Sequence, residues 1–165
     1  MSREEGPLRL LGVGESSDAY HMSAPEPSGK GAELAIRAAL DQAGLAPQQV
    51  GYINLHGTAT PKNDEMESCV VNRVFGPDVP CSSTKSQIGH TLGAAGVQEV
   101  GFCWLLLDDL NVNRQLPQHL WDGEADPELA TIGLTAEGAA WQQDVFLSNS
   151  FAFGGSNVSV IIGRS

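Results

Sequence analysis

Cationic residues are scarce in this sequence. Nine lysines and arginines stand against 20 aspartates and glutamates, which gives a formal net charge of −11 at pH 7. Nucleic acids and anionic membranes both attract clustered lysine and arginine, so the balance argues against either as a partner. It would also repel an acidic carrier protein at long range, unless the few basic residues converge locally.

Cysteine occurs only three times. Cys69, Cys81 and Cys103 are odd in number, widely spaced and free of any CxxC pattern, which favours a reduced, cytoplasmic protein. No signal peptide or lipidation motif is visible. The longest strongly apolar run, VGFCWLLL at 100–107, is too short to span a membrane.

Several motifs of nucleotide and hydrolase sites are absent. SGKG at 28–31 lacks the upstream glycine of a phosphate-binding loop, and GVGESS at 12–17 is not a dinucleotide-binding fingerprint. The GxSxG turn of serine hydrolases does not occur. The histidines are too scattered to indicate a metal site: His21, His56, His90 and His119. We therefore expect no metal and no permanently bound cofactor.

The composition fits a single folded domain. The chain has 165 residues, of which 41% are hydrophobic and 18% charged, so it can bury a core. Apolar runs bounded by turn residues predict strands at 8–13, 50–56, 79–84, 129–136, 144–155 and 156–163. Helical spacing predicts helices at 29–45, from Asn63 or Asp64 to Gly76, and at 94–109.

Each of the three predicted helices has its own sequence pattern. The residues at helical spacing in the first are Leu34, Ala35, Ala38, Ala39 and Gln42. In the second, Glu67 follows Asp64 by three residues, which is the spacing of a capping box. The third helix is apolar on most sides, and such a helix is normally buried between layers.

The elements follow the order β-α-β-α-β-α-β-β. This alternation predicts an α/β fold with a parallel sheet covered by helices, and the final hairpin around Gly154 and Gly155 makes the sheet mixed. Ligand sites in such sheets form where loops leave the carboxyl ends of strands. His56, the 82–90 loop and the 150–155 turn occupy that position, so we expect them to converge.

Some of the residues in these loops suit acyl chemistry. A neutral imidazole at His56 or His90 can donate a hydrogen bond to a thioester carbonyl as negative charge develops there. Each histidine also has a purely structural interpretation, as a buried strand-end residue or as a helix-entry residue. Glu99 lies on the apolar helix, where a buried carboxylate needs a partner, and Lys85 could supply it at the loop-to-helix junction.

Three stretches carry a resemblance to a known family. NLHGTATPKNDEMES (54–68), STKSQIGHTLGAAGVQE (83–99) and SNSFAFGGSNVSVIIG (148–163) resemble signature stretches in the C-terminal half of β-ketoacyl-acyl-carrier-protein synthases, the condensing enzymes of the thiolase fold. The resemblance extends from about residue 8 to the end. It implies that residues 1–165 form one domain, the C-terminal half of a thiolase-like fold.

The resemblance also implies an activity. Members of the family are acyltransferases that perform a decarboxylative Claisen condensation of a malonyl-carrier thioester with an acyl-enzyme, in fatty-acid, polyene or polyketide biosynthesis. By similarity, His56 and His90 are the catalytic histidines. Lys85 orients and electrostatically tunes the site, and Glu99 is its supporting acidic partner.

Further positions match by resemblance. Thr58 and Thr60 correspond to hydroxyls that contact the phosphopantetheine arm of the acyl carrier protein, although threonines are also ordinary turn residues. Phe153 corresponds to a gatekeeping phenylalanine whose backbone N–H helps to form the oxyanion hole. Gly154 and Gly155 would let the backbone approach substrate, with a simple hairpin turn as the alternative. Asp64 and Glu67 match acidic positions that helix capping explains equally well.

One feature of the family is missing. Its nucleophilic cysteine lies in a TACSS-like stretch of the N-terminal half, and neither Cys69, Cys81 nor Cys103 clearly has the exposed electropositive niche of a reactive thiol. We therefore expect the isolated chain to be inactive in condensation and to require its own N-terminal half.

The resemblance suggests several assemblies. The partners it implies are an acyl carrier protein and either a homodimer or a heterodimer with a ketosynthase. A non-catalytic subunit resembling chain-length factors is the alternative, although such a subunit has no need of His56, Lys85 and His90 together. A thiolase is disfavoured, because residues 148–157 contain no cysteine.

Overall fold

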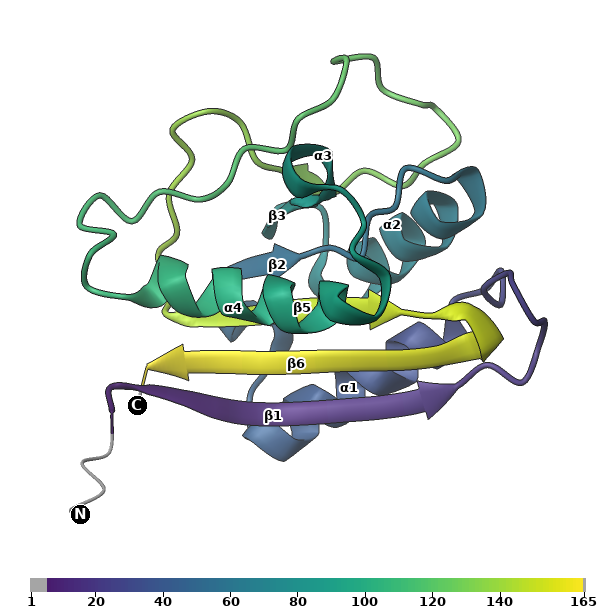
Figure 1. Cartoon of the computed structure of the whole chain (residues 1–165), viewed down its shortest axis with the longest axis horizontal. Helices are drawn as coiled ribbons and strands as arrows, with labels where there is room; N and C mark the ends of the chain where they lie inside the picture. Colours follow the sequence, from purple (N-terminus) through teal and green to yellow (C-terminus); the bar gives the residue numbers. More distant parts are fainter. Residues whose placement is uncertain (1–5, 165) are drawn as a thin grey trace.

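The structure is a computed structural model that describes residues 6–164 (Figure 1). Its strands are β1 (Leu8–Ser17), β2 (Tyr52–Asn54), β3 (Pro80–Ser82), β4 (Gly133–Leu134), β5 (Val145–Phe151) and β6 (Ser156–Arg164). Its helices are α1 (Lys30–Ala43), α2 (Pro61–Phe75), α3 (Lys85–Ile88) and α4 (Ala95–Leu107), with short 3₁₀ turns η1 (Pro47–Gln49), η2 (Leu92–Ala94) and η3 (Phe153–Gly155).

The strands form one mixed sheet, as the sequence predicts. Their order is β1-β6-β5-β2-β3-β4. β2 runs parallel to both β3 and β5, and β3 runs parallel to β4. β6 is antiparallel to β5 and to β1. The carboxyl ends of β2, β3 and β5 therefore lie at one edge of the sheet, where the candidate loops begin.

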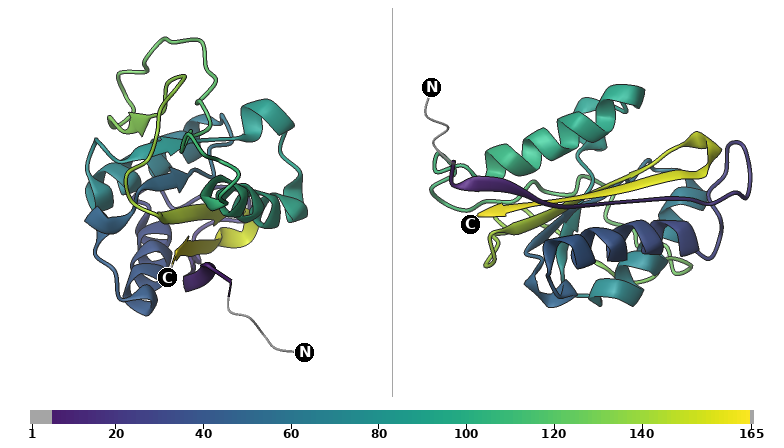
Figure 2. Two further views of the ribbon diagram at one scale, coloured as in Figure 1. Left: turned by 90° about the vertical axis from the view of Figure 1, so that its left-hand side faces the viewer. Right: turned by 90° about the horizontal axis from the view of Figure 1, so that it is seen from below.

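Helices cover both faces of the sheet (Figure 2). α1 and α2 pack on one face over a core that includes Ile36, Ile53, Val70 and Leu147. α4 packs on the other face over a second core that includes Tyr52, Cys103, Leu107, Trp141 and Phe146. Within residues 6–164, no helix combines the length and apolar character needed to cross a membrane.

β1 is longer than the predicted strand at 8–13. Gly12 lies within the predicted strand and Gly14 just beyond it, and the observed strand includes both. A Cβ atom at Gly12 would collide with the backbone oxygen of Ala39, and one at Gly14 with that of Ala35. These glycines therefore allow α1 to approach the backbone of β1 closely.

The same close approach determines the buried face of α1. The buried apolar residues are Ala32, Ala35, Ile36, Ala39 and Leu40. Leu34 is 52% exposed, and Ala38 and Gln42 are also exposed. Three of the five residues at helical spacing are therefore not buried, because α1 lays its backbone at Ala35 and Ala39 against the glycines of β1.

The start of α2 also differs from the prediction. The helix begins at Pro61 after Thr60, and no side-chain hydrogen bond caps it. Proline suits the first helical position, where its missing N–H has no intrahelical partner to lose. The capping box expected for Asp64 and Glu67 was wrong, and Glu67 is buried in a different arrangement described below.

α4 is covered on one side only. The residues that it buries are Ala95, Glu99, Cys103 and Leu107, spaced four apart along the helix. Val97 and Leu105 are 77% and 64% exposed, and Trp104 is also exposed. Within the described residues α4 is therefore not buried between two layers, contrary to the prediction from the sequence. Its outer apolar face is left uncovered, as expected for half of a thiolase-like fold.

Candidate active site

Two histidines meet at the edge where β2, β3 and β5 end. His56 follows β2, and His90 follows α3, the short helix after β3. Their ring centroids are 5.6 Å apart, with planes at 85°. Phe151, the last residue of β5, places its ring 5.8 Å from that of His56. The predicted convergence of the three loops is therefore present.

Both histidine rings are neutral at pH 7. Burial lowers the pKa of His56 to about 3, and the nearby charges of Lys85 and His90 act in the same direction. Burial, followed by the charge of Lys85, also lowers the pKa of the more exposed His90. A neutral imidazole has one N–H donor and one acceptor nitrogen. The pair can therefore present hydrogen-bond donors to a developing oxyanion.

Lys85 and Glu99 form the ion pair that the sequence suggests. Lys85 begins α3, Glu99 lies on the buried side of α4, and the ammonium contacts Glu99 Oε1. Both side chains are buried. Burial raises the pKa of Glu99, whereas the hydrogen bond from Lys85 lowers it. The pair places a cation beside the two histidines without leaving its charge unpartnered.

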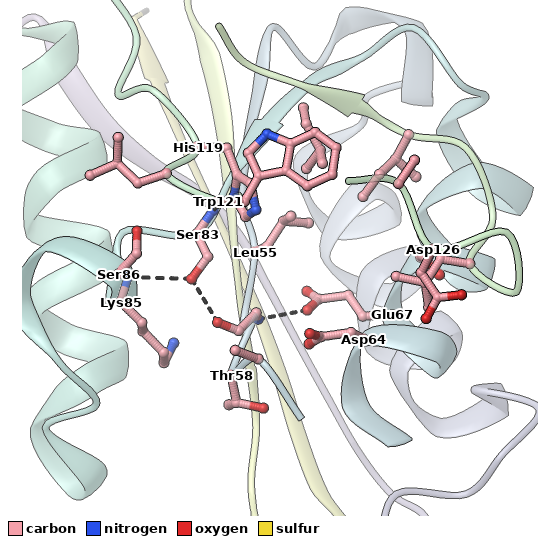
Figure 3. Close-up of a pocket in the computed structure, with 18 of the residues that line it drawn as sticks. Leu55, Thr58, Asp64, Glu67, Ser83, Lys85, Ser86, His119, Trp121 and Asp126 are labelled. Carbon is pink, nitrogen blue, oxygen red and sulfur yellow. Dashed lines mark hydrogen bonds between the residues drawn. The ribbon is translucent and has the colours of Figure 1, made fainter. Parts of the chain in front are cut away.

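Glu67 holds the turn that follows His56 (Figure 3). Its carboxylate accepts the backbone N–H groups of His56 and Gly57, both at 2.8 Å, and the Asn149 side-chain amide at 3.3 Å. Burial raises the pKa of Glu67, and the backbone donors act against this shift. A helix side chain therefore fixes the backbone that carries His56.

Ser83 and His119 are polar residues of the site that the sequence did not single out. Ser83 Oγ donates to the Gly57 carbonyl at 2.7 Å, and the Lys85 N–H donates to the same Oγ at 3.3 Å. His119 Nδ1 accepts the Ser83 N–H at 3.1 Å. Ser83 thus links the His56 turn to α3, and the 82–90 stretch was its sequence signal. No local pattern around His119 indicates its contact.

The remaining predicted residues lie around this centre. The hydroxyls of Thr58 and Thr60 are 2.9 Å apart. Phe153 lies in η3 and is 81% exposed. Gly154 and Gly155 have φ angles of 82° and 80°, and the Gly154 N–H donates to the Met22 carbonyl at 2.8 Å. Positive φ explains glycine at both positions.

A cavity of about 870 Å³ adjoins the site (Figure 3). Thr58, Lys85 and His90 are among its lining residues. The other walls come from the N-terminal part of α2 and from the segment 119–134, which contributes His119 and Trp121. This volume lies within the range typical of small-molecule pockets.

The described residues offer no metal cluster, and two of their three thiols are buried. Within 6–164, no group of three or more histidine, cysteine or carboxylate side chains could hold a metal ion. The three cysteines are unpaired. Burial raises the pKa of both Cys81 and Cys103, which keeps them protonated. Cys69 is half-buried within α2.

Two buried polar atoms of the site lack partners. His56 Nδ1 and Glu99 Oε2 make no hydrogen bond among the described residues. An unpaired buried polar atom costs about 1–3 kcal/mol. A partner from outside these residues, whether protein, ligand or solvent, would remove that cost.

Comparisons with known proteins identify the family of the chain. Residues 9–119 match the family described as "Beta-ketoacyl synthase, C-terminal domain". The 3-oxoacyl-[acyl-carrier-protein] synthase 2 of Coxiella burnetii is 36% identical and that of Vibrio harveyi 40%, each over 94% of this chain. This chain covers 37% of each relative.

Solved structures give the same result. The complex of the ketosynthase ApeO with its chain length factor ApeC from Xenorhabdus doucetiae includes a chain that is 52% identical, with a TM-score of 0.93 over 99% of this chain. The ishigamide ketosynthase/chain length factor matches at 31% identity and a TM-score of 0.85, over 94% of this chain. The matched regions are 41% and 38% of those chains.

These matches are consistent with the thiolase-like fold and with the resemblance seen in the sequence. The chain spans a little over a third of the length of the curated relatives that it matches. It therefore belongs to the β-ketoacyl synthase family, as the C-terminal domain of such a protein.

Proposed function

We propose that this chain is the C-terminal half of a 3-oxoacyl-acyl-carrier-protein synthase in fatty-acid, polyene or polyketide biosynthesis. The complete protein would condense a malonyl-carrier thioester with an acyl-enzyme, with loss of CO₂. The observation that carries the proposal is the approach of His56 and His90, with ring centroids 5.6 Å apart, beside the buried Lys85–Glu99 pair.

In this proposal the histidines are the catalytic donors. Loss of CO₂ from the malonyl group leaves an enolate, whose oxygen would accept hydrogen bonds from the neutral rings of His56 and His90. One preorganised donor of this kind is typically worth about 3–4 kcal/mol. Lys85 would add a fixed positive charge near that oxygen, and Glu99 would hold Lys85 in place.

The substrate arm and the second oxyanion would be bound nearby. Thr58 and Thr60 have adjacent hydroxyls that suit the polar, uncharged pantetheine portion of the carrier's phosphopantetheine arm. The Phe153 N–H would stabilise the oxyanion that forms on the acyl group. Two neighbouring donors are already used, because the Gly154 and Gly155 N–H groups donate to the carbonyls of Met22 and Ala152.

The nucleophile would lie in another half of the protein. We assign residues 1–165 to one domain without a nucleophilic cysteine, since Cys81 and Cys103 are buried with raised pKa values. A preceding half would cover the exposed face of α4 and supply partners for His56 Nδ1 and Glu99 Oε2. We further propose a cytoplasmic protein that binds an acyl carrier protein and forms a homodimer, or a heterodimer with a ketosynthase.

A second candidate function is a non-catalytic partner that resembles chain length factors. The match to a chain in a ketosynthase–chain length factor complex supports this alternative. The presence of His56, Lys85 and His90 together favours the condensing enzyme, because a subunit that acts only by binding has no need of all three.

Product formation in the complete protein tests the proposal. His56→Asn and His90→Asn in the protein that contains this segment should each reduce CO₂ release and 3-oxoacyl product from malonyl-carrier thioester by two orders of magnitude or more. His21→Asn, an exposed histidine outside the site, should change neither rate. Unchanged rates in both site variants would reject the catalytic assignment and favour the partner subunit.

The isolated chain gives an independent test. Incubation with an acyl-carrier thioester, followed by intact-mass measurement, should show no covalent acyl adduct on this chain. A stable adduct would contradict the proposal that the nucleophile lies elsewhere.

A further inference from the structure

The backbone of His119 is fixed against the end of β3. Its N–H donates to the Thr135 carbonyl at 2.9 Å, and the Thr135 N–H donates to the Cys81 carbonyl of β3 at 3.0 Å. The Thr135 hydroxyl also donates to the Pro117 carbonyl at 2.5 Å. The irregular segment after α4 therefore brings one histidine ring to the strand end from which the chain continues to α3.

Ser83 joins three segments of the chain at this point (Figure 3). It is buried, and its N–H donates to His119 Nδ1 at 3.1 Å. Its hydroxyl donates to the Gly57 carbonyl at 2.7 Å and accepts the Lys85 N–H at 3.3 Å. Gly57 directly follows His56, and Lys85 begins the helix that leads to the second histidine of the site. Both segments that carry these histidines are thus bonded to Ser83, and Ser83 is bonded to His119.

The contact between Ser83 and Gly57 leaves little room for adjustment. A Cβ atom at Gly57 would lie 2.5 Å from the Ser83 Cβ atom, which is closer than two such atoms can approach. Because packed groups transmit a displacement, a shift of Ser83 would move the Gly57 backbone and, with it, His56. A misplacement of about 1 Å at a reacting group can cost roughly a hundredfold in rate.

The bond from Ser83 requires the neutral form of His119. Because Nδ1 accepts the Ser83 N–H, the proton of the neutral ring is on Nε2, and a protonated ring would have no acceptor left. Burial lowers the pKa of His119, and the negative charge of Asp64 on α2 only partly opposes this shift, so the ring is neutral at pH 7. The other titratable groups that line the same cavity are Glu67, Lys85, His90, Asp122, Glu124 and Asp126.

We propose that His119 is a positioning residue for the condensation reaction: its Nδ1 holds Ser83, and Ser83 holds the two segments that place His56 and His90 side by side. In this role His119 acts through Ser83 and not on the substrate. The link to the reaction rests on the proposed function. The link to the geometry of the two histidines rests on the contacts of Ser83 alone.

Two substitutions of nearly equal shape separate the acceptor from the ring. Asparagine has a side-chain oxygen about where Nδ1 lies, so His119→Asn can keep the bond from Ser83. Leucine has the same branching without an acceptor, so His119→Leu leaves the buried Ser83 N–H unpaired. In this chain, His119→Leu should speed hydrogen exchange at the Ser83 amide roughly tenfold or more and shift the NMR signals of the His56 and His90 rings. His119→Asn should leave both close to the wild type.

A pH titration adds a signature that packing alone would not give. In the wild type, the NMR shift of the Ser83 amide should follow protonation of the His119 ring as the pH is lowered, because the protonated ring releases this N–H. In His119→Asn the amide should not show that step. His21→Leu is the matched control, because this exposed ring accepts the Ser23 N–H in the same way, and it should alter none of these signals.

Turnover by the complete protein gives the second part of the test. His119→Leu should lower kcat for CO₂ release and 3-oxoacyl product roughly tenfold or more, with KM for the malonyl-carrier thioester unchanged. His119→Asn should retain most of kcat. Loss of the acceptor, and not of the ring, would then be the cause of the slower reaction.

The possible failures can be told apart. Equal effects of His119→Leu and His119→Asn, or unchanged signals of the His56 and His90 rings in His119→Leu, would overturn the positioning role. Full activity in His119→Leu combined with lost activity in His56→Asn would overturn it as well. Unchanged activity in both His56→Asn and His90→Asn would instead reject the proposed function, and the ring signals would still decide whether His119 positions the two histidines.

Discussion

The imidazole rings of His56 and His90 lie 5.6 Å apart and nearly perpendicular, although they follow different strands of the sheet. Parallel pairing of β2 with β3 brings the two loops to one edge. Glu67 fixes the first loop, and the Lys85–Glu99 pair joins α3 of the second to α4. The geometry of the two histidines thus depends on buried carboxylates from two different helices.

The free energy of unfolding should decrease as the pH is lowered, because His56 is neutral in the folded protein. The unfolded histidine titrates near 6.5 and the folded one near 3, so the unfolded state binds a proton that the folded state does not. The loss begins as pH falls below about 6.5 and continues toward 3. At pH 5 it should reach about 2 kcal/mol.

Urea unfolding at pH 7 and pH 5 measures this loss. The His56→Asn variant should lose distinctly less stability between the two pH values than the wild type, and His21→Asn should behave as the wild type does. An identical pH dependence in wild type and His56→Asn would contradict the assignment to His56.

Breaking the Lys85–Glu99 pair should destabilise the fold strongly. Lys85→Met leaves the Glu99 carboxylate buried without its cation, and such changes cost about 3–5 kcal/mol. The double variant Lys85→Met/Glu99→Leu removes both charges and should recover most of that loss. The exposed pair of Arg37 with Glu33 is the matched control, and Arg37→Met should cost less than about 1 kcal/mol. Denaturant unfolding of the four proteins would show whether the recovery occurs.

Glu67→Gln should loosen the turn that carries His56. The two N–H groups bind different carboxylate oxygens, and the amide replaces one of these oxygens with an NH₂ group that cannot accept a hydrogen bond. We expect a loss of about 2–3 kcal/mol and faster hydrogen exchange at these two amides. Glu65→Gln, an exposed substitution on the same helix, should alter neither property. Unchanged exchange at both amides in Glu67→Gln would show that the carboxylate does not hold the turn.

The parts of the site that could be predicted are those encoded in periodicity and strand order. Alternating strands and helices placed His56, Lys85 and the 150–155 turn at one edge, and a lone glutamate on an apolar helix pointed to its pairing with Lys85. The role of Glu67 could not be predicted, because the spacing of a capping box also fits a carboxylate that binds the turn before its own helix. The contact of His119 with Ser83 depends on how the irregular segment after α4 returns to the sheet, and no periodic pattern encodes that path.

The exposed face of α4 should tolerate charge where the buried face does not. Leu105 is 64% exposed and Leu107 is 1% exposed on the same helix. Leu105→Lys should therefore change the free energy of unfolding by less than about 0.5 kcal/mol, whereas Leu107→Lys should prevent folding because it buries an unpaired charge. Apolar surface left without a partner also promotes association, so Leu105→Lys should reduce any concentration-dependent self-association measured by sedimentation. A strong loss of stability in Leu105→Lys would mean that this face is already covered within the chain.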